Sequence, residues 1–328
     1  MTSLLQTLRE RARAARHHIV LSEGTDPRVV DAALRAAEAG IGHVTVLAPE
    51  GADLPPGVAR CDPATAETDA MVEAYLEARA KRHPTRDDAA RAVRDPLIHA
   101  ALMVRTGRAD GTIGGAVHTT SDTVRAALQM IGAAPGMPLV SSFFLMVLPP
   151  SHPTRPGGAM IFSDCGLVIE PDADALAAIA RQAAASAAAL LGIEPRVALL
   201  SFSTKGSAHH RKVTKVTDAL ERLSDAPFPV DGELQFDAAF DVDVGASKAP
   251  GSAVAGHADV LVFPDLDAGN IGYKIAQRIG GATAIGPVLQ GLARPANDLS
   301  RGCSADDILD MIAVTSAQID ALGKGETT

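Results

Sequence analysis

The sequence predicts an α/β protein made of two α/β/α domains with mainly parallel sheets and a cleft between them. Short apolar runs alternate with longer amphipathic or alanine-rich segments, which is the pattern of βαβ units. The chain has 328 residues, more than one hydrophobic core usually serves. A loop rich in proline and glycine, residues 149–158, separates two such βαβ series. These observations together favour two α/β halves.

The first half opens with a helix over residues 4–16, since Leu4, Leu5 and Leu8 share one face. A buried strand follows at 18–21. The next helix starts at Pro27, a position that proline tolerates, and stops at Gly40. The rest of this half is expected to contain a strand over 44–47, mostly helix over 64–107, a strand and turn over 109–115, and a helix through residue 128.

The second half repeats the alternation. Its helix over 171–191 is alanine-rich and ends at Gly192. We expect strands over 140–148, 160–162, 197–202 and 260–263, and further helices over 212–223 and 271–279. Glycine marks three expected turns near the end, at 269–272, at Gly286-Pro287 and within 297–303. A final helix begins after Ser304.

Composition excludes several classes of function. The net charge is −9, with no Trp and two Tyr, so neither a basic surface nor a stacking platform for nucleic acid is visible. The apolar run 143–148 is far too short to span a bilayer. Three cysteines are too few for a disulfide framework or a zinc site. A reduced, cytoplasmic protein is the expectation.

The segment from Ser300 to Asp307 is the strongest candidate site. A helix N-terminus presents free N–H groups and a positive dipole end to an anion, and Arg301 can add a bidentate contact to phosphate. A turn with a surface arginine is the structural alternative. Ser304-x-x-Asp307 is also a capping-box pattern, and a helix N-terminus stabilises the ionised carboxylate. From the residues alone, a helix cap is the better interpretation of Asp307.

Other polar groups fall where an α/β sheet presents its loops. Ser203, Thr204 and Lys205 follow the strand that ends near Phe202, at an edge suited to phosphate or another polar ligand. A capped loop before a helix is the alternative. Lys248 and Asn270 are similar, individually weak candidates. Dinucleotide, P-loop, hydrolase-elbow and zincin motifs are absent from the sequence.

Several longer motifs carry a resemblance to a known family. They are Glu23-Gly-Thr-Asp-Pro-Arg, the segment 110–125, Phe202-Ser-Thr-Lys-Gly-Ser-Ala, Asp231-Gly-Glu-Leu-Gln-Phe-Asp-Ala, Lys248-Ala-Pro-Gly-Ser, Phe263-Pro-Asp-Leu-Asp-Ala-Gly-Asn-Ile-Gly-Tyr-Lys, Ile285-Gly-Pro and Asn297-Asp-Leu-Ser-Arg-Gly-Cys. Together they resemble phosphate acetyltransferase, of the phosphate acetyl/butyryltransferase family. The resemblance covers nearly the whole chain.

This resemblance implies reversible transfer of acetyl between CoA and inorganic phosphate, with no metal or redox cofactor. It implies a homodimer whose substrates are CoA or acetyl-CoA and phosphate or acetyl phosphate. It also implies a discontinuous first domain, residues 1–136 plus 295–328, and a second domain over 137–294. No nucleic-acid or membrane partner is expected.

The resemblance also assigns roles by motif position. Asp307 would deprotonate the CoA thiol, Ser300 would hydrogen-bond the reacting thiol or oxyanion, and Arg301 would hold the phosphoryl group. This implication reverses the interpretation of Asp307 as a cap alone. Arg125, in Ser121-Asp-Thr-Val-Arg, matches an arginine that binds substrate anions, and Arg79 matches another only by spacing. Ser151 stands where some members carry a cysteine.

Two alternatives remain open at this stage. A phosphate butyryltransferase would differ mainly in its acyl pocket, since a methylene or two changes binding by only about 1–3 kcal/mol. A CoA-binding regulatory module without catalysis is the non-enzyme alternative, and the presence of Ser300, Arg301 and Asp307 argues against it.

Overall fold

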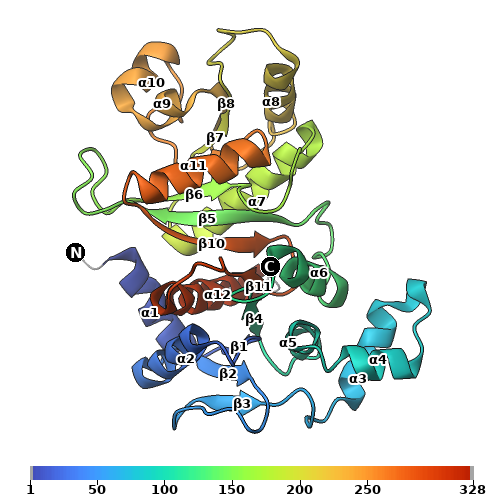
Figure 1. Cartoon of the computed structure of the whole chain (residues 1–328). Helices are drawn as coiled ribbons and strands as arrows, with labels where there is room; N and C mark the ends of the chain where they lie inside the picture. Colours follow the sequence, from blue (N-terminus) through green and yellow to red (C-terminus); the bar gives the residue numbers. More distant parts are fainter. Residues whose placement is uncertain (1–2, 326–328) are drawn as a thin grey trace. The chain divides into compact units, whose positions relative to one another are not determined.

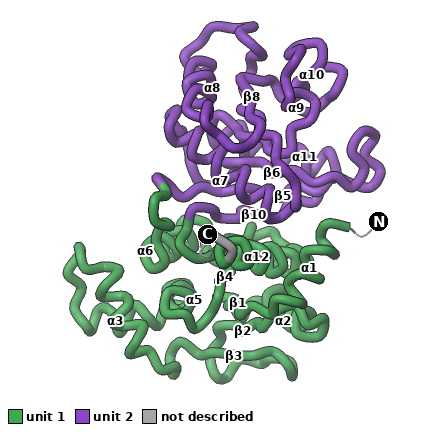
Figure 2. The backbone as a smooth tube through the Cα atoms, turned by 180° about the vertical axis from the view of Figure 1, so that it is seen from behind, with its two compact units in different colours: residues 1–137, 292–328 green, residues 138–291 purple. Residues whose placement is uncertain are grey.

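The computed structural model of the protein describes residues 3–325. The chain divides into two compact units, which Figure 2 colours separately: unit 1 is residues 1–137 with 292–328, and unit 2 is residues 138–291. Each unit has its own sheet, flanked by helices (Figure 1). The prediction of an α/β fold with two mainly parallel sheets is confirmed.

The sheet of unit 1 is parallel throughout the strands that the structure describes, in the order β11-β4-β1-β2-β3. Its strands are β1 (His18–Leu21), β2 (His43–Leu47), β3 (Ala59–Cys61), β4 (Gly111–Gly114) and β11 (Ala296–Asp298). Because β2 and β4 lie on opposite sides of β1, the loops that follow these two strands diverge at the carboxyl end of β1. Ligands of open α/β sheets usually bind at the carboxyl edge at such a point.

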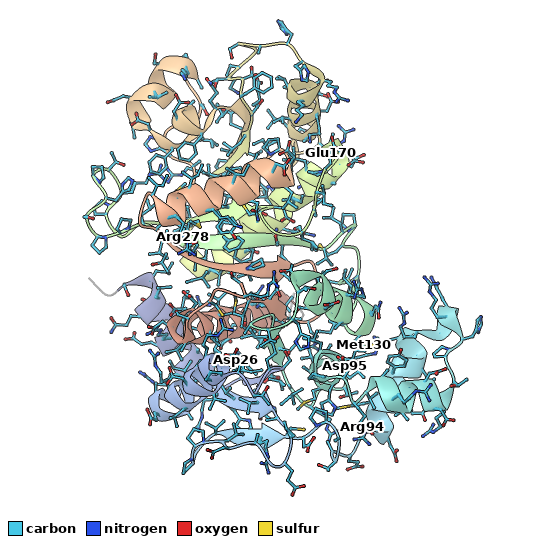
Figure 3. The ribbon with its side chains drawn as sticks, in the orientation of Figure 1. Asp26, Arg94, Asp95, Met130, Glu170 and Arg278 are labelled. Atoms are coloured by element: carbon cyan, nitrogen blue, oxygen red, sulfur yellow. The ribbon has the colours of Figure 1, made fainter. Side chains whose placement is uncertain are left out.

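Two groups of helices pack on this sheet. The first group is α1 (Leu4–Ala15), α2 (Pro27–Ala39) and α12 (Ala305–Gly325); the second is α5 (Pro96–Arg105) and α6 (Thr120–Met130), with α3 (Asp69–Ala78), η1 (Ala80–Arg82) and α4 (Arg86–Ala92) beyond them. Capping follows the sequence closely. Asp26, labelled in Figure 3, accepts from the N–H of Arg28 at the start of α2, and Gly40 ends this helix with a left-handed backbone.

The sheet of unit 2 has the order β10-β5-β6-β9-β7-β8. Its strands are β5 (Ser141–Val147), β6 (Ala159–Ser163), β7 (Val197–Leu200), β8 (Val230–Leu234), β9 (Val260–Val262) and β10 (Thr283–Gln290). The pairs β10–β5 and β5–β6 are antiparallel, and the others are parallel. Pairing of β5 with β10 joins segments about 140 residues apart, which local sequence patterns do not reveal.

Helices α7 (Ala173–Leu191) and α8 (Arg211–Glu221) pack on this sheet, as do α9 (Phe236–Phe240) and α11 (Leu266–Arg278), with α10 (Val242–Lys248) beside α9. The ring of Tyr273 on α11 stacks on Phe144 of β5, with centroids 3.9 Å apart. Helix α7 is long and apolar enough to cross a membrane. It also buries Leu176, Ile179 and Leu190 within unit 2, as a core helix does.

Two predicted turns are wrong. Residues 269–272 lie inside α11, which begins at Leu266 with Asp265 as its cap. Gly269 forms no turn. It lets the backbone of Asp164 approach α11 closely, because a Cβ at this position would lie 2.3 Å from the carbonyl oxygen of Asp164. Gly286-Pro287 lies within β10, where the pairing register with β5 shifts between Ile285 and Val288. The structure therefore places Asn270 on a helix.

Candidate functional site

The turn that follows β11 carries three of the predicted site residues. The N–H of Leu299 donates to the carbonyl of Gly114 at 2.8 Å, so the chain leaves the sheet beside β4. The turn closes when the N–H of Cys303 donates to the carbonyl of Ser300 at 2.9 Å. Ser300 and Arg301 are exposed. The Arg301 side chain forms no ion pair or hydrogen bond with any residue between 3 and 325 for which such contacts are described, so its guanidinium is available to an anion.

Asp307 forms the capping box that its spacing predicts. Its Oδ2 accepts from the N–H of Ser304 at 2.8 Å and from the Ser304 hydroxyl at 2.9 Å, while its own N–H donates to Ser304 Oγ at 3.2 Å. Within the described part of the chain, no group donates to Oδ1. Asp307 can therefore act both as a helix cap and as a proton acceptor, because Oδ2 caps the helix and Oδ1 has no donor among the described residues.

Arg28 fixes this turn from the other end of the sequence. Its Nη1 donates to the carbonyl oxygens of Arg301 and Cys303, at 2.8 and 3.0 Å. Its Nη2 donates to Asp26 at 2.9 Å and to the carbonyl of Ala116 at 2.8 Å. In the sequence, Arg28 is recognisable only as the last residue of the motif Glu23-Gly-Thr-Asp-Pro-Arg, which predicts no role for it. The motif itself was the available signal.

Cys303 is a buried thiol within the turn. Burial raises its pKa to about 11, while the nearby Arg28 lowers it and the charges of Asp307 and Asp26 raise it. A thiol with so high a pKa is a poor nucleophile near neutral pH. The structure agrees with the interpretation of Cys303 as a packed small residue.

A cavity of about 260 Å³ opens at the carboxyl edge of the unit 1 sheet. Its lining includes Glu23 and Thr25 after β1, Ala48 after β2, and Val117 and His118 after β4. Glu23 is buried and accepts three main-chain N–H groups, those of residues 116–118. The loop after β4 is thereby fixed beside the turn to which Arg28 also binds.

The two further arginines of unit 1 differ in their contacts. Arg125, on α6, pairs with Asp122 at 2.7 Å and bonds Ser121 Oγ at 3.1 Å, all on the exposed face of its own helix. Arg79 follows α3, a helix that contacts α6, and its side chain has no polar partner among the residues described. Their assignment to a substrate site stays a prediction.

In unit 2, the predicted loop after β7 is held by its own hydroxyl groups. Ser203 is buried and donates to Glu233 at 2.7 Å, and Thr204 both donates to and accepts from Gln235. Lys205 pairs with Asp231. Lys248, at the end of α10, reaches the Gln235 side chain at 3.1 Å and Asp237 at 2.7 Å.

Gln235 therefore brings Thr204 and Lys248 together at the end of β8. Asn270 lies apart from this group and donates to the carbonyl of Cys165 at 3.1 Å. Ser151 is exposed in the loop between β5 and β6. Substrate binding by these residues stays a prediction. Among residues 3–325, no group of three or more His, Cys, Asp or Glu side chains is placed to hold a metal ion.

The chain is similar to proteins of one family over almost its whole length. Residues 3–316 match the family model described as phosphate acetyl/butaryl transferase. The phosphate acetyltransferase of Paracoccus denitrificans is 54% identical over 318 residues, covering 96% of this chain and 98% of that protein. The phosphate acetyltransferase of Thermoanaerobacterium thermosaccharolyticum is 44% identical, covering 96% and 99%. A solved phosphotransacetylase from Streptococcus pyogenes has a TM-score of 0.88 at 42% identity, covering 97% and 98%. The chain belongs to the phosphate acetyl/butaryl transferase family.

Proposed function

We propose that the protein is a phosphate acetyltransferase, which converts acetyl phosphate and CoA to acetyl-CoA and inorganic phosphate, and the reverse. The turn from Ser300 to Asp307 carries the proposal. It combines an exposed hydroxyl, an exposed guanidinium and a carboxylate, all at the start of α12. Among the residues that the structure describes, the guanidinium has no ionic partner and one carboxylate oxygen accepts no hydrogen bond. Anions bind well at such a place.

In the proposed mechanism, Asp307 takes the proton of the CoA thiol and the thiolate attacks the acetyl carbonyl carbon. A carbon–sulfur bond forms, the carbon–oxygen bond to phosphate breaks, and the departing phosphate carries away the electron pair. The proton on Asp307 then returns to phosphate or to solvent. Ser300 hydrogen-bonds the thiol or the oxyanion, and Arg301 balances the phosphoryl charge.

Proton transfer from thiol to carboxylate is the demanding step. An ordinary thiol and an ordinary carboxylate differ by about 4.5 pKa units, which corresponds to roughly 6 kcal/mol. The exposed guanidinium of Arg301 supplies the positive charge that favours thiolate. Loss of water around the reactants on binding would strengthen this attraction.

The test is a thioester assay with CoA and either acetyl or butyryl phosphate. We expect acetyl phosphate to be the better donor, and Asp307→Asn to lower kcat by about 100-fold or more, the range of general-base catalysis. Asp306→Asn is the matched control, because Asp306 is the neighbouring exposed carboxylate and pairs with Arg35. Comparable turnover by Asp307→Asn would refute the general base. No thioester from either donor, with CoA still bound, would favour a regulatory module.

We also propose that acetyl phosphate and CoA, or acetyl-CoA and phosphate, suffice for this reaction and that no resident cofactor takes part. Exchange of a thioester for an acyl phosphate involves no net oxidation, and the protein supplies the base and the cationic group. Activity that survives exhaustive dialysis against a chelator is the expected result.

A homodimer is the proposed assembly, supported by an apolar stripe on α11. Ile271, Ile275 and Ile279 follow a spacing of four residues and are 58%, 52% and 84% exposed. Such a stripe favours association. We expect Ile275→Asp to lower the mass measured by light scattering, and Ile193→Asp, at an exposed position outside α11, to leave it unchanged.

The proposed location is the cytoplasm. All three cysteines are free thiols, and two of them are buried, which suits a reducing compartment. Fractionation of the source cells, with the enzyme recovered in the cytosolic fraction, tests this proposal.

A further inference from the structure

Asp298 is a buried carboxyl group directly before the proposed catalytic turn. It is the last residue of β11, pairs in register with Gly114 of β4, and precedes Ser300 by two residues. Its neighbour Asn297 donates to Thr315 Oγ1 and Gln318 Oε1 on α12. Because side chains alternate along a strand, Asp298 points to the other face of the sheet, where α6 packs.

The burial of Asp298 is complete and its hydrogen bonding is not. The residue is 0% exposed, and neither carboxylate oxygen has a hydrogen bond of normal geometry to the atoms that the structure describes. Thr120 and Thr123 of α6 lie near enough to act on the carboxyl group without completing such a bond. Buried polar groups are rarely left unpaired, so a role beyond packing is indicated.

The loop after β4 is built to accept this carboxyl group. Gly115 has φ of +98°, and a Cβ there would lie 2.1 Å from Asp298 Oδ1 and 2.8 Å from Leu299 N. Only glycine leaves room for both contacts. The carboxyl group and the first residue after the strand therefore pack directly on the loop 115–118.

A second carboxyl group holds the same loop. Glu23 accepts from the N–H groups of Ala116, Val117 and His118, at 2.6, 3.0 and 2.8 Å, and from His118 Nδ1 at 2.7 Å. These four donors are taken up by Glu23, so the donors nearest to Asp298 are the hydroxyl groups of Thr120 and Thr123 and the N–H of Leu299. Burial raises the pKa of Asp298 to about 7, the two threonine side chains lower it, and the charge of Glu23 raises it.

Other charged groups around Asp298 are engaged elsewhere. On α6, Asp122 and Arg125 pair with each other at the surface. From the β1–α2 loop, Arg28 bonds carbonyl groups and Asp26. On α5, which packs on β4, His99 contacts Cys61 and the carbonyl of Val93; Arg105, on the same helix, bonds Glu77 and the carbonyl of Met130. His118 is bound to Glu23.

We propose that Asp298, in its protonated form, is a positioning residue for the turn that carries Ser300 and Arg301. The inference rests on the proposed acetyltransferase function. The neutral carboxyl group fits against Gly115 and can share hydrogen bonds with the threonine hydroxyls. Ionisation places a second negative charge beside Glu23 in a site without water access, where the nearby Thr120 and Thr123 hydroxyls and the Leu299 N–H make no hydrogen bond of normal geometry to it. The turn must then shift to let water reach that charge.

The test compares the wild type with Asp298→Asn, a neutral variant of the same shape. The ratio of their kcat/KM values for acetyl phosphate is measured at each pH, because ionisation of CoA and phosphate cancels in the ratio. We expect the wild type to be within about threefold of Asp298→Asn at the acid end, and to fall about tenfold per pH unit above about pH 7. A ratio that does not change with pH overturns the proposal.

Thr123→Val provides a second, independent variant. The Thr123 side chain lowers the pKa of Asp298, so its removal should move the alkaline loss of activity to higher pH. Asp310→Asn is the control: Asp310 is also buried in unit 1 with a pKa raised chiefly by burial, but it pairs with Arg9 on α1. The pH profile of Asp310→Asn should match that of the wild type. If Asp310→Asn instead changed the pH profile in the same way as Asp298→Asn, the role assigned to Asp298 would not be specific to this residue.

A measurement that does not need activity separates this inference from the proposed function. The infrared difference spectrum between wild type and Asp298→Asn should show a carboxylic acid band that disappears as the pH rises through about 7. A wild type without thioester formation refutes the proposed function. Absence of the acid band in an active enzyme overturns the inference about Asp298 alone.

Discussion

Arg28 Nη1 lies 2.8 Å from the carbonyl oxygen of Arg301, and this contact joins residues 273 positions apart. The same guanidinium binds Cys303, Ala116 and Asp26. A planar fork with five donors can serve all four acceptors at once, whereas an ammonium cannot. The geometry of the turn thus depends on a residue that would not itself touch substrate.

The first prediction follows from this contact. Arg28→Lys should lower kcat about 10- to 100-fold, because a turn displaced by about 1 Å loses alignment worth that factor. The KM for CoA should change less. Arg91→Gln is the control, since the exposed Arg91 pairs with Asp88 of its own helix. Steady-state kinetics of both variants decide the matter, and an unaltered kcat for Arg28→Lys would contradict the prediction.

The second prediction separates the two functions of Asp307. Ser304→Ala removes the hydroxyl that accepts from the Asp307 N–H and donates to its Oδ2, so it should cost about 1 kcal/mol of unfolding free energy. Asp307→Asn keeps an oxygen that can cap, so it should cost less stability and far more activity. Urea unfolding and thioester assays on both variants test this contrast. Equal losses of activity would mean that Asp307 acts only as a cap.

The turn at 300–307 could be predicted because its hydroxyl, arginine and capping signals are adjacent in the chain. Arg28 could not, since its partners at 301 and 303 approach only after the parallel sheet has formed. Asp298 stands within a sequence motif, but its burial and its incomplete hydrogen bonding depend on α6 and Gly115.

Glycine was the main source of error in the fold. A glycine-rich segment is typical of a turn, yet Gly269 and Gly272 lie in α11. Glycine is needed at these helical positions because other groups approach their backbone closely. A Cβ at Gly272 would lie 3.0 Å from the Phe263 ring. Sequence alone does not distinguish a glycine needed for a turn from one needed for such an approach.

The third prediction tests this reason for Gly269. Gly269→Ala should destabilise unit 2 by about 1–3 kcal/mol, the usual cost of overpacking, because the backbone of Asp164 must move. Gly323→Ala is the matched helical control. A Cβ added there would meet no atom of the described residues within 4 Å, so the alanine should stabilise α12 by about 0.5–1 kcal/mol. Thermal unfolding of the two variants measures whether each substitution raises or lowers stability. A Gly269→Ala variant as stable as the wild type would refute the proposed clash.

The fourth prediction concerns Cys303. Its pKa of about 11 leaves only about one thiolate in a thousand at pH 8, so iodoacetamide should inactivate the enzyme slowly. Cys303→Ala should retain activity within a few-fold. Mass spectrometry of the alkylated protein identifies which thiol reacts. Rapid inactivation with label on Cys303 would show that the thiol is more accessible and more acidic than its packing indicates.

The last prediction is the pH dependence of stability that Asp298 imposes. The pKa of this carboxyl group rises from 3.8 in the unfolded chain to about 7 in the folded one. Between these values the folded protein binds the extra proton, so its stability must fall as the pH rises from about 4 to about 7 and then level off. A shift of about three units corresponds to roughly 4 kcal/mol.

Asp298→Asn carries no such proton. The difference between its unfolding free energy and that of the wild type should therefore increase in favour of the variant from about pH 4 to about pH 7 and stay constant above pH 7. Urea unfolding of both proteins at a series of pH values measures the difference, and a difference that did not change between about pH 4 and 7, or changed with the opposite sign, would show that Asp298 is ionised in the folded enzyme.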